Sequence, residues 1–181
     1  ADRIVKTIPV IAESLGASRK VIALKGAYEK EIAALREAIK NSGSDVEIFE
    51  MGYFYPAGDE QTLIQQVTGR CVPERGLPSD VGCVVDNVGT VLNIADALEG
   101  KAVTEKYLSV VGEVTHTMQL HVPIGTSVLE CVHAAKPTIS EFALIMGGPM
   151  MGKRLTSQAE IEQAVVTKTR SEERRVGKEC R

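Results

Sequence analysis

A strand, a helix and a second strand follow one another near the start of the chain, and this order constrains the fold more than any other feature. The run "KVIALKG" (residues 20–26) is short and apolar, "AYEKEIAALREAIKNSG" (27–43) has helical periodicity, and "DVEIFEM" (45–51) is again strand-like. Strands joined through a helix pair in parallel by a right-handed crossover. The sequence therefore predicts an α/β fold with parallel strands.

The residues around this unit extend the same architecture. A first helix is predicted with an apolar face formed by Ile4, Ile8, Ile11 and Leu15. Pro9 lies inside that pattern, so the helix either kinks there or begins there. Further helices are predicted at 60–69 and 88–100, and the apolar run "VGCVVDN" (81–87) predicts a third strand. We expect residues 1–102 to form one α/β domain, which the family resemblance described below implies to be part of a Rossmann-like flavin domain.

The pattern changes after residue 102. Two strand patterns, a single helix and a returning strand pattern occupy 103–152, which predicts a small β-grasp-like domain. Residues 153–169 are expected to be a connector. The last segment, "RSEERRVGKECR" (170–181), has five basic and three acidic residues and almost nothing to bury, which predicts disorder. It also resembles translated cloning-vector or adapter sequence.

Composition excludes several classes of function. The 181 residues are 44% hydrophobic and 25% charged with a net charge of −3, which is typical of a globular protein and argues against nucleic acid as a partner. No apolar run approaches the roughly 20 residues that span a bilayer, so direct membrane insertion is not expected. The cysteines, Cys71, Cys83, Cys131 and Cys180, form no C-x-x-C pair, so no metal or cluster site is expected within the chain.

Two turns have the position that ligand sites occupy in open α/β sheets, between a strand and the helix that follows it. The first, "YPAGDEQ", contains Tyr55, Gly58, Asp59 and Glu60. A glycine lets a ligand approach the backbone, carboxylates accept hydrogen bonds from hydroxyl or amide groups, and the tyrosine ring can stack. The turn is thus a candidate ligand site.

The second turn, "VDNVGT", contributes Val85, Asp86 and Asn87. Both turns have an alternative interpretation, because Asp59 is a good N-cap, Asn87 or Thr90 would cap the helix that follows, and acids in a first turn favour the helix dipole. Neither turn matches a phosphate-binding glycine motif. The residues alone leave capping and ligand binding both open.

Three segments resemble a known family. "YFYPAGDEQTLIQQVTGR", "GLPSDVGCVVDNVGTVLNIADAL" and "MGGPMMGK" are similar to the C subunit of the Rnf electron-transport complex and to its soluble relatives, the proline-reductase-associated electron-transfer proteins and the cobalamin reductases of propanediol-utilisation microcompartments. All are related to the NADH-binding flavoprotein subunit of complex I. The resemblance covers about residues 2–169.

The resemblance implies a flavin domain followed by a soluble-ligand-binding β-grasp (SLBB) domain. It implies that FMN passes electrons between NAD(H) and [4Fe–4S] clusters, with other electron-transfer subunits or a reductase as partners. The location implied is cytoplasmic, peripheral to a membrane complex or in a microcompartment. On the family pattern the four residues of the first turn would line the flavin and nicotinamide site, and Val85, Asp86 and Asn87 would form a further edge of the flavin pocket.

The family pattern also continues beyond both ends of this chain. A glycine-rich loop would precede Ala1, and cluster-binding cysteine motifs would follow residue 169. We therefore expect an internal fragment, inactive as an enzyme by itself, whose parent is an NADH-dependent oxidoreductase. The alternative is a non-redox scaffold, or a module that binds a small ligand such as a cobalamin.

Overall fold

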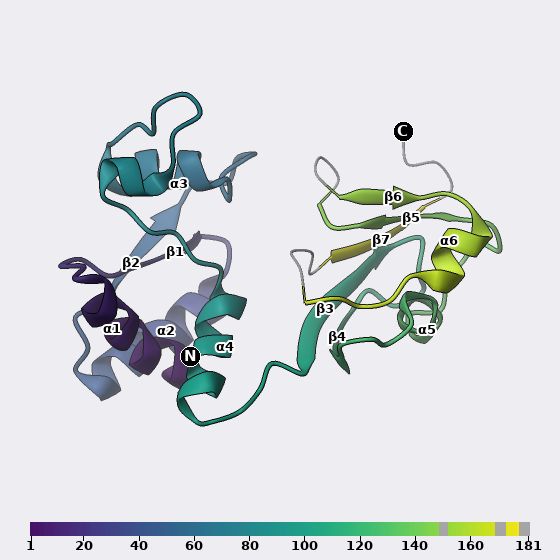
Figure 1. The fold of residues 1–181 in the computed structure, drawn as a ribbon, viewed down its shortest axis with the longest axis horizontal. Coiled ribbons are helices and arrows are strands. Elements are labelled where there is room, and N and C mark those ends of the chain that lie inside the picture. Colours follow the sequence, from purple (N-terminus) through teal and green to yellow (C-terminus); the bar gives the residue numbers. More distant parts are fainter. Residues whose placement is uncertain (149–151, 169–172, 178–181) are drawn as a thin grey trace. The chain divides into compact units, whose positions relative to one another are not determined.

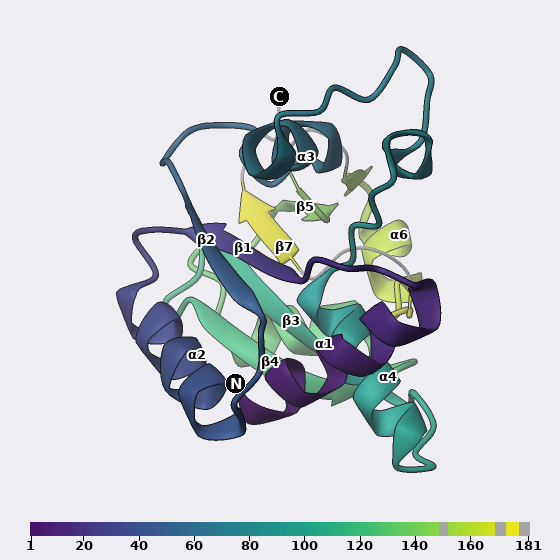
Figure 2. The same ribbon diagram turned by 90° about the vertical axis from the view of Figure 1, so that its left-hand side faces the viewer.

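The computed structural model divides the chain into two compact units, Ala1–Ala102 and Val103–Arg181. It describes residues 1–148 and 152–168, together with the backbone of 173–177. Figure 1 labels the elements of both units, and Figure 2 shows the helices and the parallel strands of the first unit from the side.

The first unit is built on the parallel pair that the sequence predicts. Strand β1 (Val21–Lys25) pairs in parallel with β2 (Glu47–Met51), with Val21 opposite Glu47 and Lys25 opposite Met51. Helix α2 (Glu29–Ser42) connects the two strands. The predicted α/β class with parallel strands is confirmed.

Helix α1 (Asp2–Leu15) packs against α2 and against α4 (Val88–Leu98). The core between the helices and the strands consists of Val5, Leu35 and Ala38, with Ile22, Leu24, Ile39 and Ile48 packed around them. Helix α1 runs through Pro9 without ending there. Of the predicted apolar face, Ile4, Ile8 and Ile11 are half-buried, whereas Leu15 is 53% exposed in the last turn, next to the left-handed Gly16 that ends the helix.

The expected third strand at residues 81–87 is not formed. A 3₁₀ helix, η1 (Pro78–Val81), precedes an irregular segment that leads to α4. In that segment half-buried and exposed residues alternate as in a strand, and Val84 is 62% exposed. A strand requires a neighbour that accepts and donates backbone hydrogen bonds, and no described strand pairs with this segment.

The second unit contains a five-stranded sheet in the order β4-β3-β7-β5-β6. Its members are β3 (Glu105–Gly112), β4 (Met118–Pro123), β5 (Ala143–Met146), β6 (Lys153–Leu155) and β7 (Glu173–Gly177). Strand β7 is parallel to β3 and antiparallel to β5, and the other neighbours are antiparallel.

Two helices, α5 (Val128–Ala134) and α6 (Gln158–Gln163), complete the core of the second unit. The buried cluster joins residues of both helices to strands β3, β5 and β6, and its members include Leu108, Val110, Val128, Val132, Leu144, Leu155 and Ile161. Period-two alternation along β3 places Leu108 and Val110 in this cluster and leaves Tyr107 exposed. The β-grasp assignment itself stays a prediction.

Two expectations about the end of the chain differ from the structure. Residues 153–169 were expected to be a connector, but they contain β6 and α6, which pack within the second unit. Residues 170–181 were expected to be disordered, but 173–177 form the central strand β7. Pairing in a sheet uses backbone groups, so a charged composition does not prevent it. Residues 149–151, within the segment "MGGPMMGK" that carries part of the resemblance, lie outside the described residues.

Candidate functional site

The first candidate turn joins β2 to α3 (Glu60–Thr68), and its backbone is held by local hydrogen bonds. The N–H of Ala57 donates to the carbonyl of Phe54, and Ala57 is 1% exposed. Asp59 is the N-cap: its carboxylate accepts from the backbone N–H and from the hydroxyl of Thr62, both at 3.1 Å. The capping interpretation of Asp59 is therefore confirmed.

The other three residues of this turn are left open to solvent. The Tyr55 side chain is 73% exposed. A Cβ built on Gly58 would meet no atom within 4 Å, so the space beside its backbone is free. Glu60 is exposed in the first turn of α3, and within the described part of the chain its carboxylate has no hydrogen bond or ion pair. The two adjacent acids thus have different surroundings.

The second candidate turn ends at α4. Asn87 is the N-cap of this helix, with its side-chain oxygen accepting from the N–H of Gly89 at 2.8 Å. Asp86 is exposed, and Val85 is half-buried beside it. Among the residues that the structure describes, no hydrogen bond or ion pair joins this turn to the first one. Each turn is therefore held by its own helix.

A cation close to the first turn was missed by the sequence reasoning. Lys25 is the last residue of β1, and its Nζ lies over the ring of Tyr53, 5.4 Å from the ring centroid. Tyr53 belongs to the segment between β2 and α3 and is 86% exposed. The signal in the sequence was a lysine at the carboxyl end of an apolar strand, where ligand sites of parallel sheets lie.

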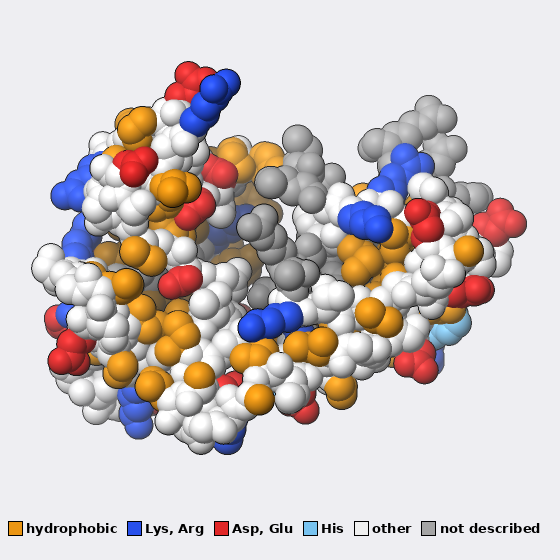
Figure 3. All heavy atoms as spheres, viewed as in Figure 1, with side chains coloured by type: hydrophobic (Ala, Val, Ile, Leu, Met, Phe, Trp, Pro, Cys, Tyr) orange, Lys and Arg blue, Asp and Glu red, His pale blue; other side chains and the backbone are white. Residues whose placement is uncertain are grey.

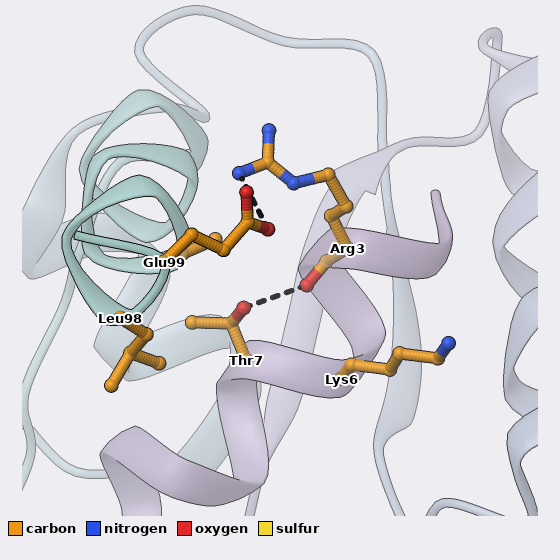
Figure 4. Close-up of a pocket in the computed structure, with 6 residues that line it drawn as sticks. Arg3, Lys6, Thr7, Leu98 and Glu99 are labelled. Carbon is orange, nitrogen blue, oxygen red and sulfur yellow. Dashed lines mark hydrogen bonds and ion pairs between the residues drawn. The ribbon is translucent and has the colours of Figure 1, made fainter. Parts of the chain in front are cut away.

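An open cavity of about 210 Å³ lies between α1 and α4, away from both turns. Arg3 forms ion pairs there with Asp96 at 2.6 Å and with Glu99 at 3.3 Å. The hydrogen bond to Asp96 raises the pKa of Arg3, and the hydrogen bond from Lys101, with the charge of Arg3, lowers the pKa of Glu99. In Figure 4 Arg3 and Glu99 point toward each other and Lys6 points away. We interpret these ion pairs as contacts that hold α1 against α4.

Two absences among the described residues bear on the kind of site. No group of three or more His, Cys, Asp or Glu side chains there is arranged to hold a metal ion. No described helix has the length and apolar character that crossing a bilayer requires. On the face of the first unit that Figure 3 shows, acidic side chains are scattered among apolar ones.

The first unit contains a parallel β-α-β unit, and a capped turn joins β2 to α3, which is the arrangement in which α/β domains place ligand sites at the carboxyl ends of their strands. Residues 1–96 match the family of the Nuo51 FMN-binding domain. The chain belongs to this family, and the match includes both candidate turns.

Relatives and a solved structure agree with this assignment. The chain is 40% identical to cobalamin reductase PduS of Citrobacter freundii and 34% identical to the C subunit of the Na⁺-translocating ferredoxin:NAD⁺ oxidoreductase complex of Acetobacterium woodii, over 87% and 84% of its length. It covers 35% of each of these relatives, so it spans about a third of their length. The resemblance to the cobalamin reductases and to the Rnf protein is thereby confirmed.

The fold also matches one chain of an NAD⁺-reducing [NiFe]-hydrogenase in the H₂-reduced state. The TM-score is 0.82 at 20% sequence identity, over 97% of this chain and 36% of the hydrogenase chain. At this identity the match concerns the fold alone.

The chemistry of the turns fits part of an FMN molecule. The open side of Gly58 leaves room for a ligand, and the carboxylates of Glu60 and Asp86 can accept hydrogen bonds from ribityl hydroxyls or a ring N–H. As at the start of any α-helix, the first backbone N–H groups of α3, those of Glu60 and Gln61, have no acceptor within the helix. None of the seven predicted residues is a cation, so they offer the phosphate no positively charged side chain.

Proposed function

We propose that the first unit binds FMN at the turns 55–60 and 85–87, as part of a protein that passes electrons between NAD(H) and iron–sulfur clusters. The observation that carries this proposal is the match of residues 1–96 to an FMN-binding domain family, which includes both turns. Relatives named as parts of ferredoxin:NAD⁺ oxidoreductase complexes support the redox reaction.

The bound flavin supplies the redox chemistry, and the chain supplies position and electrostatics. Asp59 and Asn87 hold the starts of α3 and α4. Glu60, one residue beyond the Asp59 cap, accepts a hydrogen bond from the cofactor or from the nicotinamide. Gly58 permits close approach, and the ring of Tyr55 covers an apolar part of the ligand.

The second turn completes the proposed site at its other edge. Val85 contributes an apolar contact, and the Asp86 carboxylate accepts a hydrogen bond from a cofactor hydroxyl or ring N–H. The carboxylates of Asp86 and Glu60 disfavour extra negative charge nearby, which would favour a neutral reduced flavin.

The test of this proposal is Glu60→Gln in the full-length protein. We expect flavin content and melting temperature close to the parent, and slower reduction of the flavin by NADH in stopped-flow absorbance. Glu37→Gln is the matched control, because Glu37 is an exposed carboxylate on α2 with no partner in the described residues. Equal NADH kinetics for Glu60→Gln and the parent would remove the role assigned to Glu60. A parent protein without flavin would overturn the proposed function.

The remaining parts of the proposal concern the rest of the protein. We infer that the [4Fe–4S] clusters are bound outside the described residues, which provide no metal-binding group. Other electron-transfer subunits or a reductase would be the partners, and no nucleic acid is expected. The location that agrees with this function is cytoplasmic, peripheral to a membrane complex or within a microcompartment.

A second candidate function places a small ligand in the second unit, and the relatives named as cobalamin reductases, which are 40% identical to the chain, favour a cobalamin as that ligand without indicating a non-redox role. In this alternative the second unit binds a small ligand such as a cobalamin, and the protein acts as a non-redox scaffold. Absorbance spectra of the purified full-length protein separate the two: a co-purifying flavin supports the first proposal, and a corrinoid without flavin supports the second.

A further inference from the structure

Lys25 is placed where the proposed flavin site lacks a cation. It ends β1 opposite Met51, the last residue of β2, so its side chain leaves the carboxyl end of the parallel pair. Its ammonium lies over the Tyr53 ring, in the segment that continues into Tyr55 and Gly58. Lys25 is half-buried, and a partly buried lysine commonly packs its aliphatic stem while its ammonium stays in solvent.

The ammonium of Lys25 is also free to bind an anion. The other basic residues that contact β1 or β2 form ion pairs: Arg19 with Glu47, Lys20 with Asp45, and Arg36 with Glu50. Within the described part of the chain, the ammonium of Lys25 has no carboxylate within 4.0 Å. Its contact there is with the neutral ring of Tyr53. A cation–π contact orients an ammonium and leaves its charge uncompensated.

The acidic turns favour such a cation beside a bound nucleotide. Asp59, Glu60 and Asp86 bring three carboxylates to the proposed site, and a phosphate monoester adds up to two more negative charges. Like charges at this edge oppose binding unless a cation offsets them. We propose that Lys25, oriented by the ring of Tyr53, binds the phosphate of a nucleotide cofactor at this edge. The proposal rests on the flavin function proposed above.

The phosphate has two possible sources, FMN and NAD(H), and riboflavin separates them because it is FMN without its phosphate. The full-length protein, freed of bound flavin, is titrated with FMN and with riboflavin by fluorescence quenching. We expect Lys25→Gln to weaken FMN binding about tenfold, as for the loss of a charge-assisted hydrogen bond. Riboflavin binding should change less than about twofold, within ordinary surface effects. Lys25→Arg should retain most of the FMN affinity.

Lys40→Gln is the matched control. It removes the same charge from the last turn of α2, at the end of the helix far from Lys25. The first turn of α2, which contains Lys30, follows Lys25 closely, and Lys40 lies ten residues or about 15 Å further along the helix. FMN affinity should stay at the parent value. Tyr53→Leu should weaken FMN binding about two- to fivefold, and Tyr53→Phe should not, because the ring alone supports the ammonium.

Each result decides the proposal. If Lys25→Gln leaves FMN affinity intact and weakens NADH binding about tenfold, the phosphate belongs to NAD(H) and the proposal holds. Equal losses for FMN and riboflavin would show that Lys25 only shapes the turn, which overturns it. Unchanged affinity for FMN and NADH also overturns it. A parent protein that binds neither flavin overturns the proposed function itself, and the Lys25 proposal with it.

Discussion

Helices α3 and α6 both begin with carboxylates, and the chain uses them differently. At α6, the Glu160 carboxylate accepts from the backbone N–H groups of Ser157 and Thr156 and from the Ser157 hydroxyl, at 3.1 to 3.2 Å. At α3, Asp59 caps the helix and the adjacent Glu60 has no partner in the described part of the chain. The acid at α6 is wholly structural, whereas α3 keeps one acid free.

This difference shows how a structural acid can be told from a candidate ligand-binding acid. A complete capping box satisfies both the helix and the carboxylate, as at Ser157 and Glu160. An acid next to a cap that is already complete adds nothing to the cap. Glu60 is in this position, beside the open backbone of Gly58.

The largest expected effect on stability comes from replacing the single buried residue of each helix. These residues are Ile64 in α3 and Ile161 in α6. Each change to Ala should lower the free energy of unfolding by about 2–5 kcal/mol. Ile161→Ala should be the more severe, because Ile161 belongs to the large buried cluster of the second unit and Ile64 does not belong to either cluster described. Chemical denaturation measures both.

The corresponding changes to Val are the controls for these two sites. They remove one methylene and should cost about 0.5–1.5 kcal/mol each. If Ile64→Ala lowered the free energy of unfolding no more than Ile64→Val does, the buried side chain of Ile64 would not be what holds α3 in place.

The next effect in size concerns the caps. Asp59→Ala should lower the free energy of unfolding by about 1 kcal/mol, because the N–H of Thr62 loses its acceptor. Asp59→Asn should cost less, since Asn also caps, and Glu60→Gln should stay within about 0.5 kcal/mol. Thermal melts of the three variants measure this order. A Glu60→Gln variant as unstable as Asp59→Ala would contradict the division of roles between the two acids.

The smallest effect is a pH dependence at α6. The N–H of Ser157, then that of Thr156 and the Ser157 hydroxyl, hold the pKa of Glu160 below its usual range. A carboxyl whose pKa is lowered on folding stabilises the fold above its unfolded pKa of about 4.3, and this contribution is lost as the pH falls through the folded value. Glu160→Gln should therefore be less stable than the parent at neutral pH.

The pH series itself is the critical measurement for Glu160. The stability difference between parent and Glu160→Gln should shrink as the pH falls below the ordinary glutamate pKa, as followed by urea denaturation. Glu141→Gln removes an exposed carboxylate from the same unit and controls for net charge. A difference that stays constant with pH would show that the carboxylate of Glu160 is not what the cap requires.

Much of the first unit followed from sequence because its elements depend on near neighbours. The spacing of apolar residues predicted β1, α2 and β2. Residue type predicted the cap at Asp59 and left Asn87 or Thr90 for α4, where the structure has Asn87. The run at 81–87 looked like a strand because its apolar residues are continuous, but it has no pairing partner in the described structure. The expectation failed because pairing depends on another part of the chain.

The sequence by itself determined the order of helices and the parallel pair of strands, because these arise from periodicity and from contacts within a few residues. It also placed acids at the starts of helices. Only the tertiary structure decided which acid stays free, that Lys25 lies over Tyr53, and that 173–177 lies between β3 and β5. These features join segments distant along the chain, and local residue patterns do not encode such contacts.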